Sequence, residues 1–179
     1  MIRPRLVALI SIILAAALSR LLPHPPNMTS VAAVALFGGA YFSDRRLAFL
    51  VPLTALFVSD LFLGFYSHME VQYLSFALIV CIGLWLEKDR SVLRIAVAAL
   101  ASSVLFFLLT NFGVWAFGSL YPRTLDGLLD CYIAAIPFFR NTLQGDVLYT
   151  LILFGGFALL ERRFSILRES SVRSGMSSA

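Results

Sequence analysis

Apolar residues run along the chain in six stretches separated by short polar or proline-containing breaks. A stretch of roughly 20 helical residues, rising 1.5 Å each, crosses the hydrocarbon core of a bilayer. The pattern therefore predicts an all-α integral membrane protein with six transmembrane helices. The stretches cover residues 5 to 22, 29 to 43, 47 to 66, 71 to 86, 95 to 119 and 142 to 160.

Two segments depart from this simple pattern. The second stretch is short and contains Gly38 and Gly39, so we expect it to be tilted, broken or shielded by its neighbours. Between the fifth and sixth stretches, the amphipathic sequence LDGLLDCYIAAIPFF ends near Pro137 and predicts a helix lying at the membrane interface. Counting it as a span would give seven. We expect residues 1–165 to form a single transmembrane domain and residues 166–179 to form a disordered cytoplasmic tail.

Composition supports a membrane location. The chain has 179 residues, of which 60% are hydrophobic and 13% charged, whereas a soluble domain carries about 25% charged residues. The net charge of +4 comes from basic residues dispersed in short loops, which argues against nucleic-acid binding and favours a role in topology. Cys81 and Cys131 lack metal-ligand spacing.

The basic residues predict an orientation. With the N-terminus inside, eleven of the fourteen lie on the cytoplasmic side and only Arg20, Arg123 and Arg140 lie outside, as the positive-inside rule favours. Both termini would then be cytoplasmic. The first residues, MIRPRLVALISIILAAALS, also fit a cleaved signal peptide, and that alternative stays open.

A carboxylate inside the third stretch raises the question of function. Asp60 would lie roughly 9 Å below the outer membrane edge, at 1.5 Å per residue, where a charge is costly. Asn111 would lie about 12 Å down, with Trp115 one turn above it. Gln144 and Asp146 enter from the outer end of the sixth stretch. These residues predict a polar pocket that opens outward.

The outer connections contribute further candidates for this substrate pocket. They are His24, Asn27, His68, Arg140 and Asn141. The alternative for Asp60 is a buried structural ion pair, with Arg140 as the nearest obvious partner.

Motifs of catalysis and energy conversion are absent from the sequence. The only lysine is Lys88, so no phosphate-binding loop ending in Lys and Ser or Thr exists. The two histidines lack zinc-site spacing, and no nucleophile elbow is present. We therefore expect no enzyme activity, no metal and no cofactor.

The first stretch carries small residues four apart. Ser11, Ala15 and Ser19 would let another helix approach closely. They predict a partner-docking face, and ordinary packing within the bundle is the alternative.

Four segments of the chain are PHPPNMTSVAAVALFGGAYFSDRR, PLTALFVSDLFLG, TNFGVW and RNTLQGD. Together they resemble an uncharacterised bacterial membrane-protein family that is similar to the S-components, the substrate-binding subunits of energy-coupling factor (ECF) transporters. The resemblance implies an inner-membrane receptor with six helices that captures a vitamin or similar small molecule. A separate ATPase module would supply the energy, unless the protein acts alone.

The resemblance also implies roles for particular residues. An ECF coupling subunit would dock on Ser11, Ala15 and Ser19. Some solitary S-components bind cobalamin, and His68 or His24 would then be the cobalt ligand. The alternative function is a non-transporting scaffold of the cell-envelope or cell-shape machinery, with the polar cluster as a partner interface.

Overall fold

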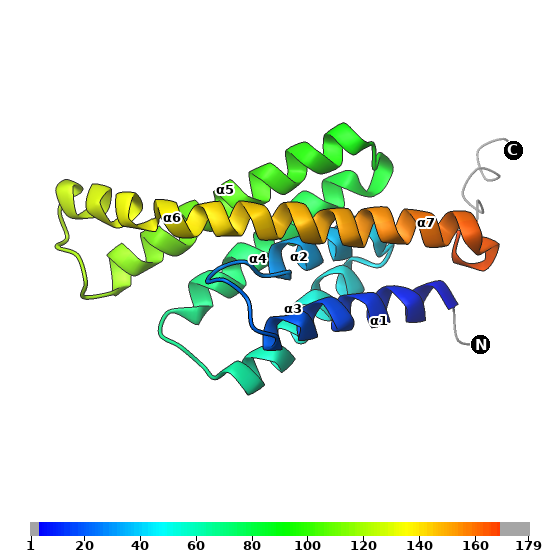
Figure 1. Cartoon of the computed structure of the whole chain (residues 1–179), viewed down its shortest axis with the longest axis horizontal. Coiled ribbons are helices and arrows are strands. Elements are labelled where there is room, and N and C mark those ends of the chain that lie inside the picture. The colour runs from blue at the N-terminus through cyan, green and yellow to red at the C-terminus, as the bar shows by residue number, and fades with distance from the viewer. Residues whose placement is uncertain (1–3, 169–179) are drawn as a thin grey trace, which may run out of the picture.

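The computed structural model describes residues 4–168, and within them the chain forms a bundle of helices joined by short connections (Figure 1). A π-helical turn, η3, joins α6 to α7 without a break. The longer helices are α1 (Pro4–Leu18), α2 (Val31–Tyr41), α3 (Arg45–Leu63), α4 (Met69–Trp85), α5 (Val92–Phe117), α6 (Leu125–Thr150) and α7 (Gly156–Arg163). The short turns are η1 (Ser19–Leu21), η2 (Leu86–Lys88), η3 (Leu151–Gly155) and η4 (Ser165–Leu167).

Among residues 4–168, five helical segments are long and apolar enough to cross a membrane. They are Pro4–Leu21, Arg45–Leu63, Met69–Lys88, Val92–Phe117 and Leu125–Arg163. The predicted all-α multi-pass architecture is therefore confirmed. The sixth expected crossing, α2, has only 11 residues and a length of about 16 Å, so a count of six spans remains a prediction.

Helix α2 forms the centre of the bundle, and all of its residues are buried. A Cβ atom on Gly39 would lie 2.3 Å from the carbonyl oxygen of Val80, and one on Gly83 would lie 2.4 Å from that of Leu36. Helices α2 and α4 therefore touch backbone to backbone, which only glycine permits at these positions. The expectation that its neighbours shield this short helix is confirmed.

The two ends of the bundle differ in chemistry. Helix α1 begins and α7 ends at the same side of the bundle (Figure 1), where the connections carry basic residues such as Arg45, Lys88 and Arg162. We call this side the basic end. The opposite side, which we call the loop end, is formed by residues 22–30, 64–68 and 118–124. The assignment of the basic end to the cytoplasm remains a prediction.

The expected interfacial helix is not a separate element. Residues 125–139 form the first part of α6, which continues through Pro137. The hydroxyl of Thr124 caps the helix by accepting from the Gly127 amide at 3.2 Å, and the Tyr132 hydroxyl donates to the Leu108 carbonyl of α5 at 2.8 Å. Because these contacts tie the segment to α5, it extends the last helix instead of lying apart from the bundle.

The last described turn folds back onto the start of the chain. Arg5 forms an ion pair with Glu161 at 2.5 Å and also donates to the carbonyl oxygen of Leu167 in η4. Residues 169–179 of the predicted tail lie outside the described residues.

Candidate functional site

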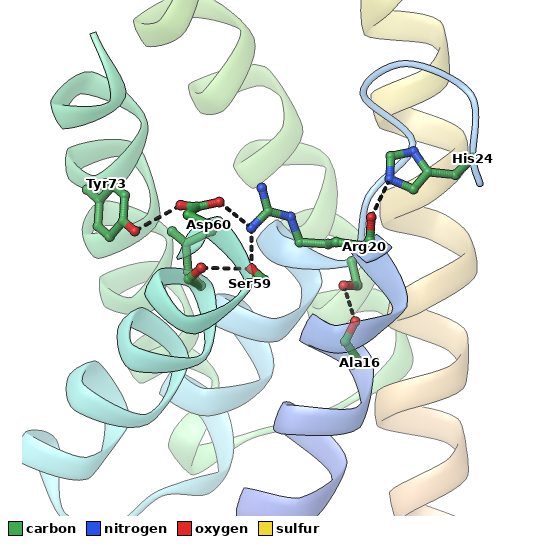
Figure 2. A network of polar contacts seen from close by, with 8 residues as sticks. Ala16, Arg20, His24, Ser59, Asp60 and Tyr73 are labelled. Atoms are coloured by element: carbon green, nitrogen blue, oxygen red, sulfur yellow. Dashed lines mark hydrogen bonds and ion pairs between the residues drawn. The ribbon is translucent and has the colours of Figure 1, made fainter. Parts of the chain in front are cut away.

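Asp60 lies in the last turns of α3 and is fully buried. Figure 2 shows Arg20 and Tyr73 approaching its carboxylate from opposite sides. Nη1 of Arg20 lies 2.7 Å from Oδ1, and the Tyr73 hydroxyl donates to Oδ2 at 2.9 Å. The same Arg20 nitrogen also donates to Oγ of Ser59 at 2.5 Å. The charge of Asp60 is therefore compensated by one cation and one hydroxyl.

The expected partner of Asp60 was wrong. Arg140 is exposed on α6, whereas Arg20 of η1 is buried with 8% of its surface accessible. Depth along a helix does not reveal which way a side chain points, so a count of residues could not choose between the two arginines. The short 3₁₀ turn after α1 aims Arg20 inward at the level of Asp60.

A cavity of about 310 Å³ lies beside this ion pair, near the loop end. Arg20 forms part of its wall, whereas Asp60 lies behind Arg20 and is not among the lining residues. Both polar groups and aromatic rings line the cavity. The lining residues are Arg20, His24, Asn27, Thr29, Ala32, Tyr66, Gln72, Phe76, Phe106, Thr142 and Asp146.

A second cavity of about 200 Å³ adjoins the first. Both are lined by Asn27, Gln72, Phe106 and Thr142, so they share a wall. We call the two cavities together the loop-end site and each of them a lobe. Asn111 lines the second lobe, and its side-chain amide donates to the Phe107 carbonyl of its own helix at 2.8 Å.

Asp146 of α6 is the second buried carboxylate, with 4% of its surface accessible. Its Oδ2 accepts from Oγ of Ser103 at 2.6 Å. That same Oγ lies 3.1 Å from the carbonyl oxygen of Ala99. No ion pair joins Asp146 to a cationic side chain among residues 4–168. Among residues 4–168, the Ser103 hydroxyl is therefore the only group that compensates the charge of this carboxylate.

The structure brings together part of the predicted pocket. His24, Asn27, Asn111 and Asp146 line the loop-end site, and Asp60 supports it from behind through Arg20. The other candidates do not line the site. Trp115 donates to the Pro122 carbonyl at 3.0 Å, and Asn141 donates to the Pro26 carbonyl at 3.0 Å. His68 faces Glu70 at 3.6 Å, and Arg140 and Gln144 are exposed.

His24 is poorly arranged as a metal ligand. Its Nδ1 lies 3.0 Å from the Pro25 carbonyl oxygen and its Nε2 lies 3.2 Å from that of Arg20. A ligating imidazole needs a nitrogen lone pair that faces the metal, and both nitrogens here face acceptors. No cluster of three or more acidic, histidine or cysteine side chains that could hold a metal occurs within residues 4–168.

Several lining residues escaped the sequence-based prediction. Thr142, Phe76 and Phe106 lie in helix interiors, where residue type alone does not distinguish a cavity wall from ordinary packing. Tyr66 follows α3 in a loop. Its partial burial and the nearby Asp60 carboxylate raise the pKa of the Tyr66 hydroxyl to about 12, so this phenol contributes a neutral group to the site.

Residues 1–169 match the sequence profile of a family described as a family of unknown function, DUF6580. This chain belongs to the DUF6580 family. No curated protein and no solved structure matched the chain. The expected likeness to S-components therefore remains a prediction, and the function of this DUF6580 member must be argued from its own residues.

The predicted docking face on α1 is only partly available. Ser11 and Ala15 are exposed. Oγ of Ser19 donates to the Ala16 carbonyl at 2.6 Å and lies 2.9 Å from the Tyr149 hydroxyl of α6. The third small residue therefore contacts the bundle itself, and two residues of the stripe remain on the outer surface.

A groove of about 450 Å³ lies between α5 and the α6–α7 helix and reaches the basic end. Its walls are mainly apolar, with Arg90 and Arg162 toward the basic end. Arg90 is held there, since its Nε donates to the Ala40 carbonyl at 2.8 Å and its guanidinium lies 4.5 Å from the Tyr41 ring centroid. Asp146 lines this groove as well as the loop-end site.

Proposed function

We propose that this protein is a membrane-embedded binding protein for the uptake of a vitamin or similar small molecule, which it holds in the loop-end site. The observation that carries the proposal is the site itself. Two adjoining cavities of about 310 and 200 Å³ combine aromatic walls with a few convergent polar groups, which is the usual character of a small-molecule pocket.

The position of the site supports uptake from outside the cell. The basic residues gather at the opposite end of the bundle, and basic loops favour the cytoplasmic side. In this orientation the loop end faces outward from the bacterial inner membrane, both termini are cytoplasmic, and the ligand enters between residues 22–30 and 64–68.

Energy for release would come from a partner. The chain contains no phosphate-binding loop, so an ECF-type coupling subunit with its ATPases is the natural complement, unless the protein acts alone. The exposed Ser11 and Ala15 of α1 offer the close approach that such a subunit needs. Capture of a coupling subunit by the wild type but not by Ala15→Leu would test this docking.

The proposal is tested by native mass spectrometry of protein released from detergent. We expect a co-purified small molecule on the wild type and its loss from Thr142→Trp, because Thr142 lines both lobes and the new ring would fill their space. Gln144→Trp, on the exposed side of the same helix, is the matched control and should keep the molecule.

Two outcomes would contradict the proposal. One is a wild-type protein that carries no small molecule, and the other is equal retention by Thr142→Trp. Co-purification with cell-envelope proteins in place of a ligand would favour the scaffold function.

A further inference from the structure

The charges that line the loop-end site are unequally compensated. Arg20 is paired with Asp60 at 2.7 Å, so that pair contributes no net charge. Tyr66 is neutral because the pKa of its hydroxyl is raised to about 12. Asp146 accepts one hydrogen bond from Ser103 and has no cationic partner among the described residues. A buried carboxylate in this situation must bind either a proton or another cation.

The surroundings of Asp146 suit both of those states. When the carboxyl is protonated, its O–H donates to Oγ of Ser103, whose own O–H turns to the Ala99 carbonyl at 3.1 Å. When it is ionised, the Ser103 O–H turns to Oδ2, which lies at 2.6 Å. By rotating, the Ser103 hydroxyl can bond either the neutral carboxyl or the ionised carboxylate. Its position is therefore compatible with both protonation states of Asp146.

We propose that Asp146 binds the positively charged group of the ligand, so that the substrates of this site are small organic cations with an apolar or aromatic part. This inference rests on the proposed function, because it assigns the substrate class of the same site. An ammonium group beside the ionised carboxylate supplies the positive charge that Asp146 does not find among the described residues.

The rest of the cavity fits a molecule of this class. Phe76 and Phe106 stack with a centroid distance of 5.4 Å and an interplanar angle of 15°, and both line the cavity. Aromatic faces attract cations and pack against apolar groups. Asn27, Gln72 and Thr142 line both lobes and offer hydrogen bonds to neutral polar groups of the ligand.

Binding of a cation displaces the proton from Asp146. The neutral carboxyl and the cationic ligand give a carboxylate–cation pair and one released proton, so charge is conserved. The released proton has two routes, because Asp146 lines both the loop-end site and the groove of the basic end. Thr150, one turn further along α6, lines that groove with its buried Oγ1 unpaired among residues 4–168.

Proton release fixes the sign of the pH dependence. A proton and the ligand compete for Asp146, so affinity falls as the pH is lowered and reaches a plateau once the free carboxyl is ionised. The other titratable or charged groups that line the two hollows around Asp146 are Arg20, His24 and Tyr66 on the loop side and Tyr41, Arg90 and Arg162 on the basic side.

The test uses choline, whose trimethylammonium group keeps its charge at every pH, and its neutral isostere with carbon in place of nitrogen. Both are titrated calorimetrically into the ligand-free protein in lipid nanodiscs across a pH series. We expect choline to bind more tightly than the isostere, with an affinity that falls by up to about tenfold per pH unit on the acid side. Buffers of different ionisation enthalpy should reveal one released proton.

Variants assign the effect to a residue. Asp146→Asn keeps the shape and removes the charge, so we expect choline affinity at the plateau to fall by about 10- to 100-fold and to lose its pH dependence. Its melting temperature without ligand checks that it folds. His24→Gln replaces the histidine that lines the cavity and is the matched control, so it should keep the pH dependence.

The proposal is overturned if choline fails to bind the wild type, if the isostere binds equally well, or if Asp146→Asn retains the pH dependence. These results contradict only the role of Asp146. The proposed function remains supported as long as a co-purified molecule is found in the loop-end site. A co-purified molecule that carries no positive charge would also overturn the cation assignment alone.

Discussion

The two carboxylates buried in this bundle differ in the partners that the chain gives them. Asp60 has a guanidinium at 2.7 Å and a phenol at 2.9 Å, and it does not line the cavity. Asp146 has one serine hydroxyl at 2.6 Å, and it lines two hollows. A carboxylate that the fold fully compensates serves the structure, whereas one left with a single hydroxyl is available to a ligand.

The largest effect is expected from breaking the compensated pair. Asp60→Asn leaves the guanidinium of Arg20 buried without a counter-charge, which costs on the order of 3 to 5 kcal/mol. Chemical unfolding in mild detergent measures this loss. Asp89→Asn, which breaks the exposed pair between Asp89 and Arg94 at 3.0 Å, is the control and should change stability by about 0 to 1 kcal/mol.

A double variant sharpens the same comparison. Arg20→Gln combined with Asp60→Asn removes both charges and should recover most of the stability lost in Asp60→Asn. If the double variant is as unstable as the sum of the single variants, or if Asp60→Asn is as stable as the wild type, Asp60 is not held by Arg20 in the way described.

A smaller effect is expected at the second partner of Asp60. Tyr73→Phe removes the hydroxyl that donates to Oδ2 and should cost about 1.5 to 3 kcal/mol, the range for hydrogen bonds to charged groups. Tyr132→Phe removes a hydroxyl that bonds the neutral Leu108 carbonyl, so its loss should lie near about 1 kcal/mol. Equal losses in the two variants would show that the Asp60 carboxylate is not charged.

The smallest effect on stability is expected at Asp146. In the ligand-free state that we propose, Asp146→Asn replaces a neutral carboxyl by a neutral amide of the same shape, so we expect the free energy of unfolding without ligand to change by no more than about 0.5 kcal/mol. Ser103→Ala should cost about 1 kcal/mol more than Ser102→Ala, because the Oγ of Ser102 bonds only the Ala98 carbonyl of its own helix. A loss at Asp146 as large as that at Asp60 would erase the difference between the two sites.

Sequence patterns predicted the helices and the proximity of some polar residues, because both follow from distance along the chain. The apolar stretches became helices, shielding of α2 was one of the three alternatives expected from its length and its two glycines, and Asn111 and Asp146 line adjoining cavities. Depth is proportional to residue number in a helix, so this part of the prediction needs no tertiary information.

The direction in which side chains point could not be predicted in the same way. The choice of Arg140 over Arg20 was wrong because it depends on how helices are rotated against each other, and the 3₁₀ turn of η1 sets the direction of Arg20. Pro137 suggested the end of a helix, yet α6 continues through it because contacts with α5 hold both sides of the proline. Such contacts are tertiary and leave no periodic signal in the sequence.

The protonation state of Asp146 tests this account most directly. Infrared spectra of the ligand-free protein in lipid, recorded through a pH series from acid to neutral, show the C=O stretch of any neutral carboxylic acid. We predict such a band that persists after the exposed carboxyls have ionised, that Asp146→Asn removes and that Asp60→Asn leaves in place. Absence of the band in the wild type, or its removal by Asp60→Asn, would contradict the account.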